Sequence, residues 1–407
     1  MDHLVLLVSR GRHDGADGAK GRNTTCEIPA PYTPSPTTPV AGRYDFYHLN
    51  VIVSGACAAF STVVILLLMW QHATHMSKPK EQMHILRIAW FIPVYAIGIW
   101  IMILEPRVYV YLLSFIVIYE AYALAYFYLL LCEILAEPAD AALGERAVLL
   151  SPLIAHARRK GVSVTNANGF FSPHWRFRRH FVEAFQCPPL MVLLMVAGVT
   201  TQATGTYCLT AHDAVHAHLY LVVVQIVSMV AAIIGVVHTY VPLRRELKEH
   251  RALSKLWAFK LLIFLQVAQG LAFSILDGIS PPSIENSDVF SPIDIIVGIP
   301  LLIVSCELVF FAIFFHYAYS VAPYQLSDEQ LRSGQRYAMH CWRVWWDILK
   351  IHDLIAATKF MFRLGEEIRL LERDMQMQER QSWSPAKAKE ESGHEVGVVV
   401  GWVEAVR

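Results

Sequence analysis

The chain has 407 residues, of which 55% are hydrophobic and 17% charged, and its formal net charge at pH 7 is zero. One soluble core does not hide so much apolar surface, so the composition excludes an ordinary soluble domain and predicts a membrane protein. The basic clusters lie beside apolar segments, where lipid headgroups explain them, and they give no support for nucleic-acid binding.

Residues 1–48 are polar and contain a proline-rich stretch, PAPYTPSPTTP, at residues 29–39. Such a composition favours an extended chain without a packed core. Asn23 begins an Asn-Thr-Thr triplet, which is the acceptor pattern for N-glycosylation. We therefore expect a disordered tail that is extracellular or lumenal.

Seven segments of mainly apolar residues follow, and each is long enough to cross the hydrocarbon core of a bilayer as a helix. Pro93 and Pro300 lie inside the second and seventh segments, and each predicts a kink. The predicted fold is all-α: a seven-transmembrane helix bundle over residues 49–319 with an amphipathic C-terminal cytoplasmic helix. The segments are residues 49–70, 86–104, 109–135, 189–209, 217–240, 258–278 and 293–317.

Lysine and arginine are distributed unequally between the two sides of this bundle. The loops after the third and fifth segments carry seven and five of these residues, and the tail after the seventh carries twelve. In the three loops on the opposite side, Arg107 is the only lysine or arginine. Because basic loops stay in the cytoplasm, we expect a cytoplasmic C-terminus and an N-terminus that is outside or lumenal.

Two carboxylates lie deep in the predicted membrane. From the helical rise, Glu120 lies about 16 Å and Glu307 about 21 Å below the outer ends of their segments. Gln266 and Gln269 fall in or near the same layer, and Gln225 lies nearer the outer side. Hydrogen bonding between helices explains a single glutamine well. A charge at mid-bilayer costs at least about 2.5 kcal/mol, so the two glutamates favour a solute or proton site, with the glutamines as further binding residues.

Signatures of soluble enzymes are missing from the sequence. We find no GxxxxGK[ST], GxGxxG after a strand, GxSxG or HExxH. The seven cysteines are scattered, and several histidines lie at membrane edges without a matching ligand set. We therefore expect no catalytic site, no metal and no cofactor. These edge histidines are His72, His75, His84, His212, His216 and His218.

The tail after the last segment offers a second class of function. From about residue 335 to 372, apolar residues recur at three-to-four spacing, which predicts an amphipathic helix within a cytoplasmic region at 320–376. Tryptophans beside basic residues favour a helix in the lipid headgroup zone. Trp346 and Leu349 also fit the aromatic-x-x-aliphatic pattern of short peptides that ubiquitin-like autophagy proteins bind. Such binding requires both side chains to face water. We expect residues 377–407 to be disordered.

Several short motifs occur in order over about residues 45–320. Their residues are Ser77, Lys78, Pro79, Glu81, Gln82, Arg87, Pro93 and Tyr95, then Tyr119 with Glu120, Gln186, Lys260, Gln269 and Gly270, and lastly Cys306 with Glu307. Together these motifs resemble the organic solute transporter alpha family, which includes the transmembrane protein 184 type. In that family one residue often separates the seventh-segment Cys and Glu, whereas here they are adjacent, so Glu307 is the residue that corresponds.

The resemblance implies facilitated diffusion of amphipathic organic solutes, with a single-pass subunit or a second copy of the chain as partner. Fungal and plant members imply a vacuolar or other endomembrane location and a link to autophagy, with the plasma membrane as the alternative. A scaffold that recruits autophagy-type partners through the C-terminal helix is the second hypothesis. A receptor ranks last, because the third segment lacks an acidic-Arg-Tyr triplet and the seventh lacks NPxxY.

Overall fold

The structure is a computed structural model, and it describes part of the chain. Every described regular element is a helix, and these residues contain no β-strand. The described residues are 39–40, 42–136, 145–160, 173–207, 216–248, 254–258, 261, 265, 269, 290, 294–338 and 341–382.

Six helical stretches among the described residues are long and apolar enough to cross a membrane. Two of these stretches contain helices with the predicted bounds, α4 (Tyr109–Leu135) and α10 (Ala217–Tyr240). The predicted segment at 258–278 lies almost entirely outside the described residues, so the seventh span stays a prediction. The six stretches are Phe46–Thr74, Pro79–Leu104, Pro106–Leu135, Trp175–Ala203, Ala217–Leu243 and Ile299–Tyr324.

Prolines interrupt or begin several of these helices. The second stretch is divided into α2 (Pro79–Ala89) and α3 (Phe91–Leu104) at Trp90, and Pro93 lies in the first turn of α3. A π-turn, η3 (Asp294–Gly298), precedes α12 (Ile299–Ala318), whose second residue is Pro300. A proline in the first helical turn loses no hydrogen bond, because the N–H groups there have no partner within the helix.

The fourth stretch is also divided, into α8 (Pro173–Phe185) and α9 (Cys187–Ala203). It ends six residues before the predicted limit at 209. The chain turns at Thr204 and Gly205, and Gly205 takes a positive φ of 70° that favours glycine.

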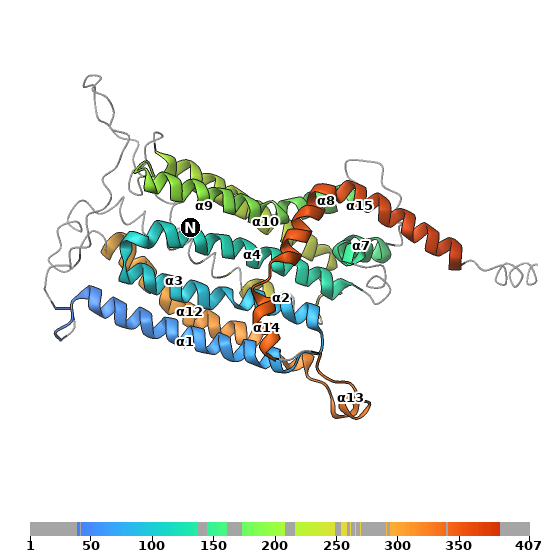
Figure 1. Cartoon of the computed structure of the whole chain (residues 1–407), viewed down its shortest axis with the longest axis horizontal. Helices are drawn as coiled ribbons and strands as arrows, with labels where there is room; N and C mark the ends of the chain where they lie inside the picture. Colours follow the sequence, from blue (N-terminus) through green and yellow to red (C-terminus); the bar gives the residue numbers. More distant parts are fainter. Residues whose placement is uncertain are drawn as a thin grey trace, which may run out of the picture.

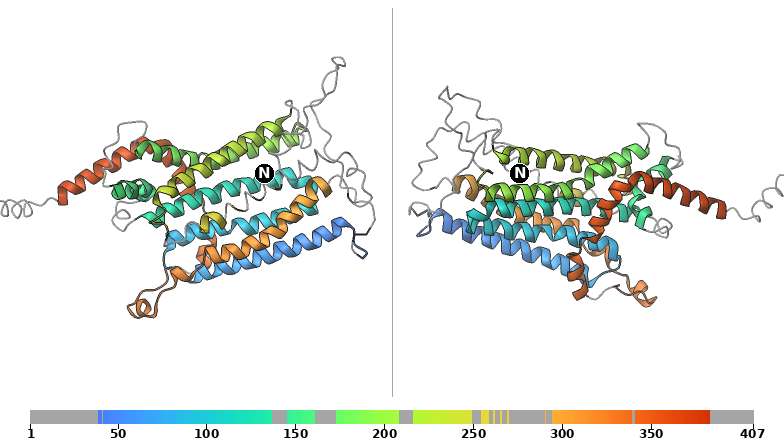
Figure 2. Two further views of the ribbon diagram at one scale, coloured as in Figure 1. Left: turned by 180° about the vertical axis from the view of Figure 1, so that it is seen from behind. Right: turned by 45° about the horizontal axis from the view of Figure 1, so that its top comes forward.

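The helices of the membrane domain run side by side (Figure 1). Helix α1 (Phe46–Thr74) packs against α12 and α3, and α4 packs against α2, α3 and α9, with α10 beyond it; the views in Figure 2 show the same order. In the spanning stretch that contains α4, 83% of an 18-residue apolar segment is buried inside the structure. In α1 the buried share of such a segment is only 28%. Helix α4 is therefore the central helix, and one face of α1 is left for lipid.

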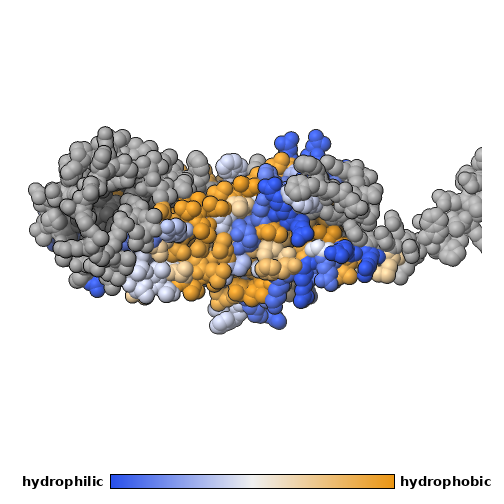
Figure 3. All heavy atoms as spheres, turned by 90° about the horizontal axis from the view of Figure 1, so that it is seen from above, coloured by the Kyte–Doolittle hydropathy of each residue, from blue (hydrophilic) through white to orange (hydrophobic). Residues whose placement is uncertain are grey.

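Apolar side chains form a band around this bundle. On α1, outward-facing side chains such as Phe60, Val63 and Leu67 are about half exposed. Figure 3 shows the band over the middle of the molecule, with hydrophilic residues gathered towards the end where the C-terminal helices lie. We call this the tail end of the bundle.

The predicted single amphipathic helix of the tail is wrong, because the structure has separate helices there. A Ser327–Gln330 capping box starts the short helix α13 (Asp328–Arg332). Helix α14 (Cys341–Ile348) then crosses the bundle and packs against α1 and α2 (Figure 1). Helix α15 (His352–Ser382) packs against α8 and includes residues 377–382, where the sequence predicts that a disordered tail begins. Residues 383–407 lie outside the described residues, so the disordered tail stays a prediction.

The remaining described helices are short and lie between or beyond the spans. They are η1 (Pro106–Val108), α6 (Glu145–Leu149), α7 (Ser151–Lys160), η2 (Val241–Leu243) and η4 (Ala322–Tyr324), together with the helical residues 254–258.

Candidate functional site

Glu120 lies on the central helix α4 and is only 5% exposed. Its carboxylate is close enough to the Cys187 thiol, at the start of α9, for the two groups to interact electrostatically. The Glu120 Oε1 atom is buried and has no hydrogen-bond partner among the described residues. A buried acceptor without a partner costs free energy, so this oxygen is suited to a proton or to a donor on a bound molecule.

A pair of polar side chains joins the helices beside Glu120. Ser228 Oγ on α10 donates to Gln186 Oε1 at 3.0 Å, and Gln186 Nε2 donates to the Ser228 backbone oxygen at 3.1 Å. Gln186 is the residue between α8 and α9, so these bonds fix the start of α9 against α10. Gln186 therefore has a packing role at the junction of α8, α9 and α10.

Glu307 lies on α12 and is partly buried. Gln269 Nε2 donates to Glu307 Oε1, so the structure brings these two predicted site residues together. The Oε2 atom of Glu307 is buried and has no partner among the described residues. Gln225 is half-buried on α10, while Gln266 lies outside the described residues.

The two glutamates belong to separate polar clusters in the described part of the chain. Glu120 lies beside the start of α9, whereas Glu307 lies on α12, which packs against α1 and α3. No hydrogen bond joins the two clusters among the described residues. The geometry thus gives two carboxylate positions, one in the centre of the bundle and one nearer its edge.

The first motif, Ser77 to Gln82, forms a polar network at the tail end. Lys78 Nζ pairs with Glu81 Oε1 at 2.9 Å, and Tyr324 Oη donates to Glu81 Oε2 at 3.2 Å. Gln82 Nε2 lies 3.2 Å from His72 Nδ1 and donates to the His75 backbone oxygen at 2.9 Å. These residues hold the end of α1, the start of α2 and η4 (Ala322–Tyr324) together, and Pro79 begins α2.

The next motif residue, Arg87, is 1% exposed and anchors the C-terminal helices. Its guanidinium donates to an Asp353 carboxylate oxygen and, at 3.1 Å, to the Asp347 backbone oxygen, and it lies 5.0 Å from the centre of the Tyr126 ring. Tyr119 Oη donates to the Arg87 backbone oxygen at 3.4 Å. Of the other motif residues, Pro93 and Tyr95 are buried on α3, Cys306 is half-buried, and Lys260 and Gly270 lie outside the described residues.

A cavity of about 430 Å³ lies at the tail end, between α7, α8, α10 and η2. Another, more open one lies between α1 and α12, around His316 and Tyr317. Glu120 and Glu307 line neither of these two cavities. The cavity beside α8 has a mixed apolar and basic wall that includes Leu153, His156, Trp175, Arg176, His180 and His238.

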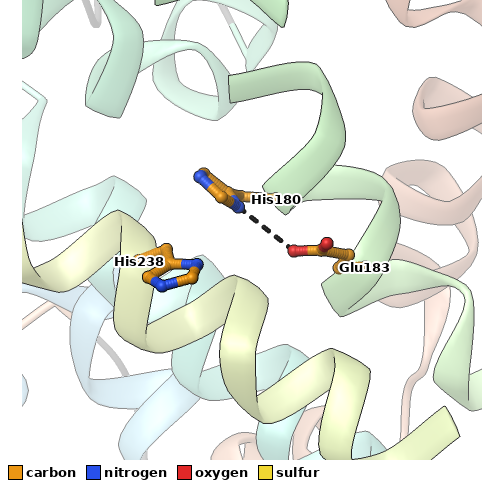
Figure 4. A group of neighbouring side chains, drawn as sticks. All are labelled: His180, Glu183 and His238. Atoms are coloured by element: carbon orange, nitrogen blue, oxygen red, sulfur yellow. Dashed lines mark hydrogen bonds and ion pairs between the residues drawn. The ribbon is translucent and has the colours of Figure 1, made fainter. Parts of the chain in front are cut away.

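Sequence reasoning missed a group of possible metal ligands beside that cavity. His180, Glu183 and His238 each offer a ligand atom, and these atoms all lie within 4.8 Å of one another (Figure 4). The spacing of His180 and Glu183 on one helix was visible in the sequence. His238 comes from another helix, and nothing in a single sequence pairs it with them.

Trp346 and Leu349 are 73% and 61% exposed, on and just after α14. The docking hypothesis requires both side chains to face away from the bundle, and they do. The opposite side of α14 carries the buried residues Val344 and Ile348.

Comparisons with known proteins agree on one family. The model of the family described as organic solute transporter Ostalpha matches residues 50–324. Protein LAZ1 of Arabidopsis thaliana is 24% identical over 303 residues, which cover 72% of this chain and 61% of that protein. A transmembrane protein 184 homolog of Dictyostelium discoideum is 25% identical over 315 residues, covering 74% and 59%. The chain thus spans about three fifths of each relative, and no solved structure matches it.

Proposed function

Because this chain belongs to the organic solute transporter Ostalpha family, we propose that it carries amphipathic organic solutes across a membrane by facilitated diffusion. The family prediction made from the short motifs is confirmed over residues 50–324. Because its described residues already contain six apolar helical stretches of spanning length, the chain is an integral, multi-pass membrane protein.

One observation within the membrane domain carries the proposal. Glu120 is a buried carboxylate on the central helix, and its Oε1 atom has no partner among the described residues. An ionisable group in the membrane is costly and normally serves a solute or proton pathway. In the proposed mechanism Glu120 accepts a hydrogen bond from the solute, and Glu307 with Gln269 provides a second polar position.

The experiment is transport by the purified full chain in liposomes without any ion gradient. A radiolabelled steroid sulfate that keeps a free hydroxyl group, the donor that the proposed contact with Glu120 requires, serves as an amphipathic probe. Facilitated diffusion predicts uptake to equilibrium that is faster than in protein-free liposomes, and unlabelled steroid sulfate inside should accelerate it. Uptake equal to that of protein-free liposomes would contradict transport of this solute class.

The assembly and the location are further parts of the proposal. We infer a vacuolar or other endomembrane location, or the plasma membrane, with the N-terminus outside or lumenal and the C-terminus cytoplasmic. The partner is a single-pass subunit or a second copy of the chain, and the apolar band meets membrane lipid. Cross-linking of the chain in native membranes, followed by mass determination, would distinguish these partners.

A second candidate function rests on the exposure of Trp346 and Leu349. We propose as the alternative that these side chains dock a ubiquitin-like autophagy protein, so that the chain acts as a scaffold. Replacing both by alanine should abolish capture of such a protein. Trp342→Ala is the matched control, because Trp342 is also exposed, at 78%, but lies outside the pattern. Equal capture by the double variant and the control would exclude the docking function.

A further inference from the structure

Three side chains meet at the tail end of the interface between α8 and α10. His180 and Glu183 lie one turn apart on α8, and His238 faces them from the last turn of α10 (Figure 4). Their ligand atoms all lie within 4.8 Å of one another. We propose that these three residues bind a divalent transition-metal ion of the zinc type. Two imidazole nitrogens and one carboxylate oxygen are a ligand set that zinc takes in proteins.

The backbone packing explains why the two histidines are opposed. Gly235 lies one turn before His238, and a Cβ atom placed on it would come within 2.6 Å of the His180 backbone oxygen. Only glycine permits so close an approach of α10 to α8. The approach brings the His180 and His238 rings to 5.0 Å between centroids, at an interplanar angle of 54°.

The His238 side chain is open to a ligand. It is exposed to solvent, makes no hydrogen bond to any residue that the structure describes, and faces the His180 ring. A metal ion bound between the two rings would give the His238 imidazole a partner.

The carboxylate is already held in an orientation suited to binding. Arg179 Nε donates to Glu183 Oε1 at 2.7 Å, which leaves Oε2 directed at His180 Nδ1, 3.1 Å away. A metal ion would take the place of the proton between Oε2 and Nδ1, and the neutral His180 imidazole would then carry its proton on Nε2. Arg179 would remain as an outer contact, as is usual for carboxylates that ligate metals.

The cavity of about 430 Å³ supplies room for a fourth ligand. His180 and His238 both line it, together with Arg176 and Arg179. A fourth position that opens into this space suits water or an anionic group, because two guanidinium groups lie in its wall. The ion would also join α8 to α10.

Metal titration of the purified full chain tests the proposal. The chain carries 18 histidines, so it is purified with an affinity tag that contains none, stripped with a chelator, and titrated with Zn²⁺ and with Co²⁺. We expect one equivalent of either metal per chain. The Co²⁺ complex should show the visible absorption of a tetrahedral or five-coordinate site.

Three variants and one control localise the binding. His180→Ala, His238→Ala and Glu183→Gln should each weaken Zn²⁺ binding by about tenfold or more. His316→Ala, which removes a histidine from the tail end of α12, should leave it unchanged. Zn²⁺ should raise the unfolding temperature of the intact chain and of the control, but not of the three variants, because only binding to the folded state stabilises it.

Two results would overturn the metal site. One is no stoichiometric Zn²⁺ binding by the intact chain, and the other is undiminished binding by all three variants. Helix content by circular dichroism and a single elution peak identify variants that have not folded, and for these His180→Gln and His238→Gln replace the alanine substitutions. The titration measures no transport, so its failure leaves the proposed function unaffected.

Discussion

The guanidinium of Arg87, buried in the membrane domain on α2, pairs with the carboxylate of Asp353 in the first turn of α15, 266 residues later in the chain. The Arg87 side chain is 2% exposed and that of Asp353 35%. A buried charge is tolerated only when it is paired. The C-terminal helices therefore supply a contact that the membrane domain needs for its stability.

The asymmetry of this pair gives the first prediction. Asp353→Ala leaves the buried Arg87 charge uncompensated and should lower the free energy of unfolding by about 2 kcal/mol, less than for a fully buried pair because Asp353 is partly exposed. Thermal unfolding and tryptic release of α15 measure the effect. Lys359→Ala, at an exposed position on the same helix, is the control. Equal stability of the two variants would show that the pair contributes nothing.

The same pair predicts a pH dependence. Burial raises the pKa of Asp353, but the hydrogen bond and positive charge of Arg87 outweigh it and hold this pKa below its ordinary value. A lowered pKa in the folded state contributes stability above the unfolded-state pKa of about 3.9 and loses it as the pH falls through the folded-state pKa. Docking of α15 should therefore be constant from neutral pH to about pH 4 and weaken below it.

Pepsin cleavage of the tail between pH 2 and pH 4 measures this docking. Each cleavage rate is divided by the rate for an unfolded reference peptide, which corrects for the pH dependence of pepsin itself. The corrected rate for the intact chain should rise as the pH falls, whereas that for Asp353→Asn should be fast at every pH. Parallel pH profiles for the two proteins would assign the effect to other carboxyl groups.

Replacing glycine by alanine should have opposite effects on stability at Gly235, in the contact between α8 and α10, and at Gly365, on α15. Gly235→Ala forces α10 away from the His180 backbone oxygen and should destabilise the chain by about 1–3 kcal/mol. Gly365→Ala lies inside α15, where a Cβ atom would meet only Arg178 at 3.9 Å, so it should stabilise that helix by about 0.5–1 kcal/mol. Unfolding temperatures compare them, and a neutral Gly235→Ala would refute the close approach.

The orientation of the bundle is the next prediction. Tags at residue 330 and in the 140–180 loop should be protected from protease by a sealed membrane, and a tag near residue 20 should be cleaved. In a glycosylating cell, endoglycosidase should shift the intact chain but not Asn23→Gln. Cleavage of the 140–180 loop from the outer side would reverse the orientation.

The sequence predicts those parts of the fold that depend on runs of apolar residues. The bounds of α4 and α10 were predicted correctly, because each is a long run bounded by polar or turn-forming residues. The division at Trp90 and the break between α14 and α15 were missed, since hydrophobic periodicity does not reveal where one helix turns into another.

Pairings between distant residues could not be predicted. Arg87 was identified only as a motif residue, and its partner Asp353 follows 266 residues later. His238 likewise meets His180 only because Gly235 lets two helices touch. The pairing of Glu307 with Gln269 was partly predicted, because the helical rise placed both residues in the same layer of the membrane.

The central claim is that Glu120 serves transport, and a matched pair of substitutions on α4 tests it most directly. Glu120→Gln keeps the size of the side chain but removes its charge and replaces one acceptor oxygen by an NH₂ donor, and Glu133→Gln makes the same change at the half-buried tail end of that helix. Steroid sulfate uptake into liposomes containing equal amounts of folded protein compares them. We expect Glu120→Gln to lose about tenfold or more of the flux and Glu133→Gln to keep it. Equal flux through both variants and the intact chain would contradict a transport role for Glu120.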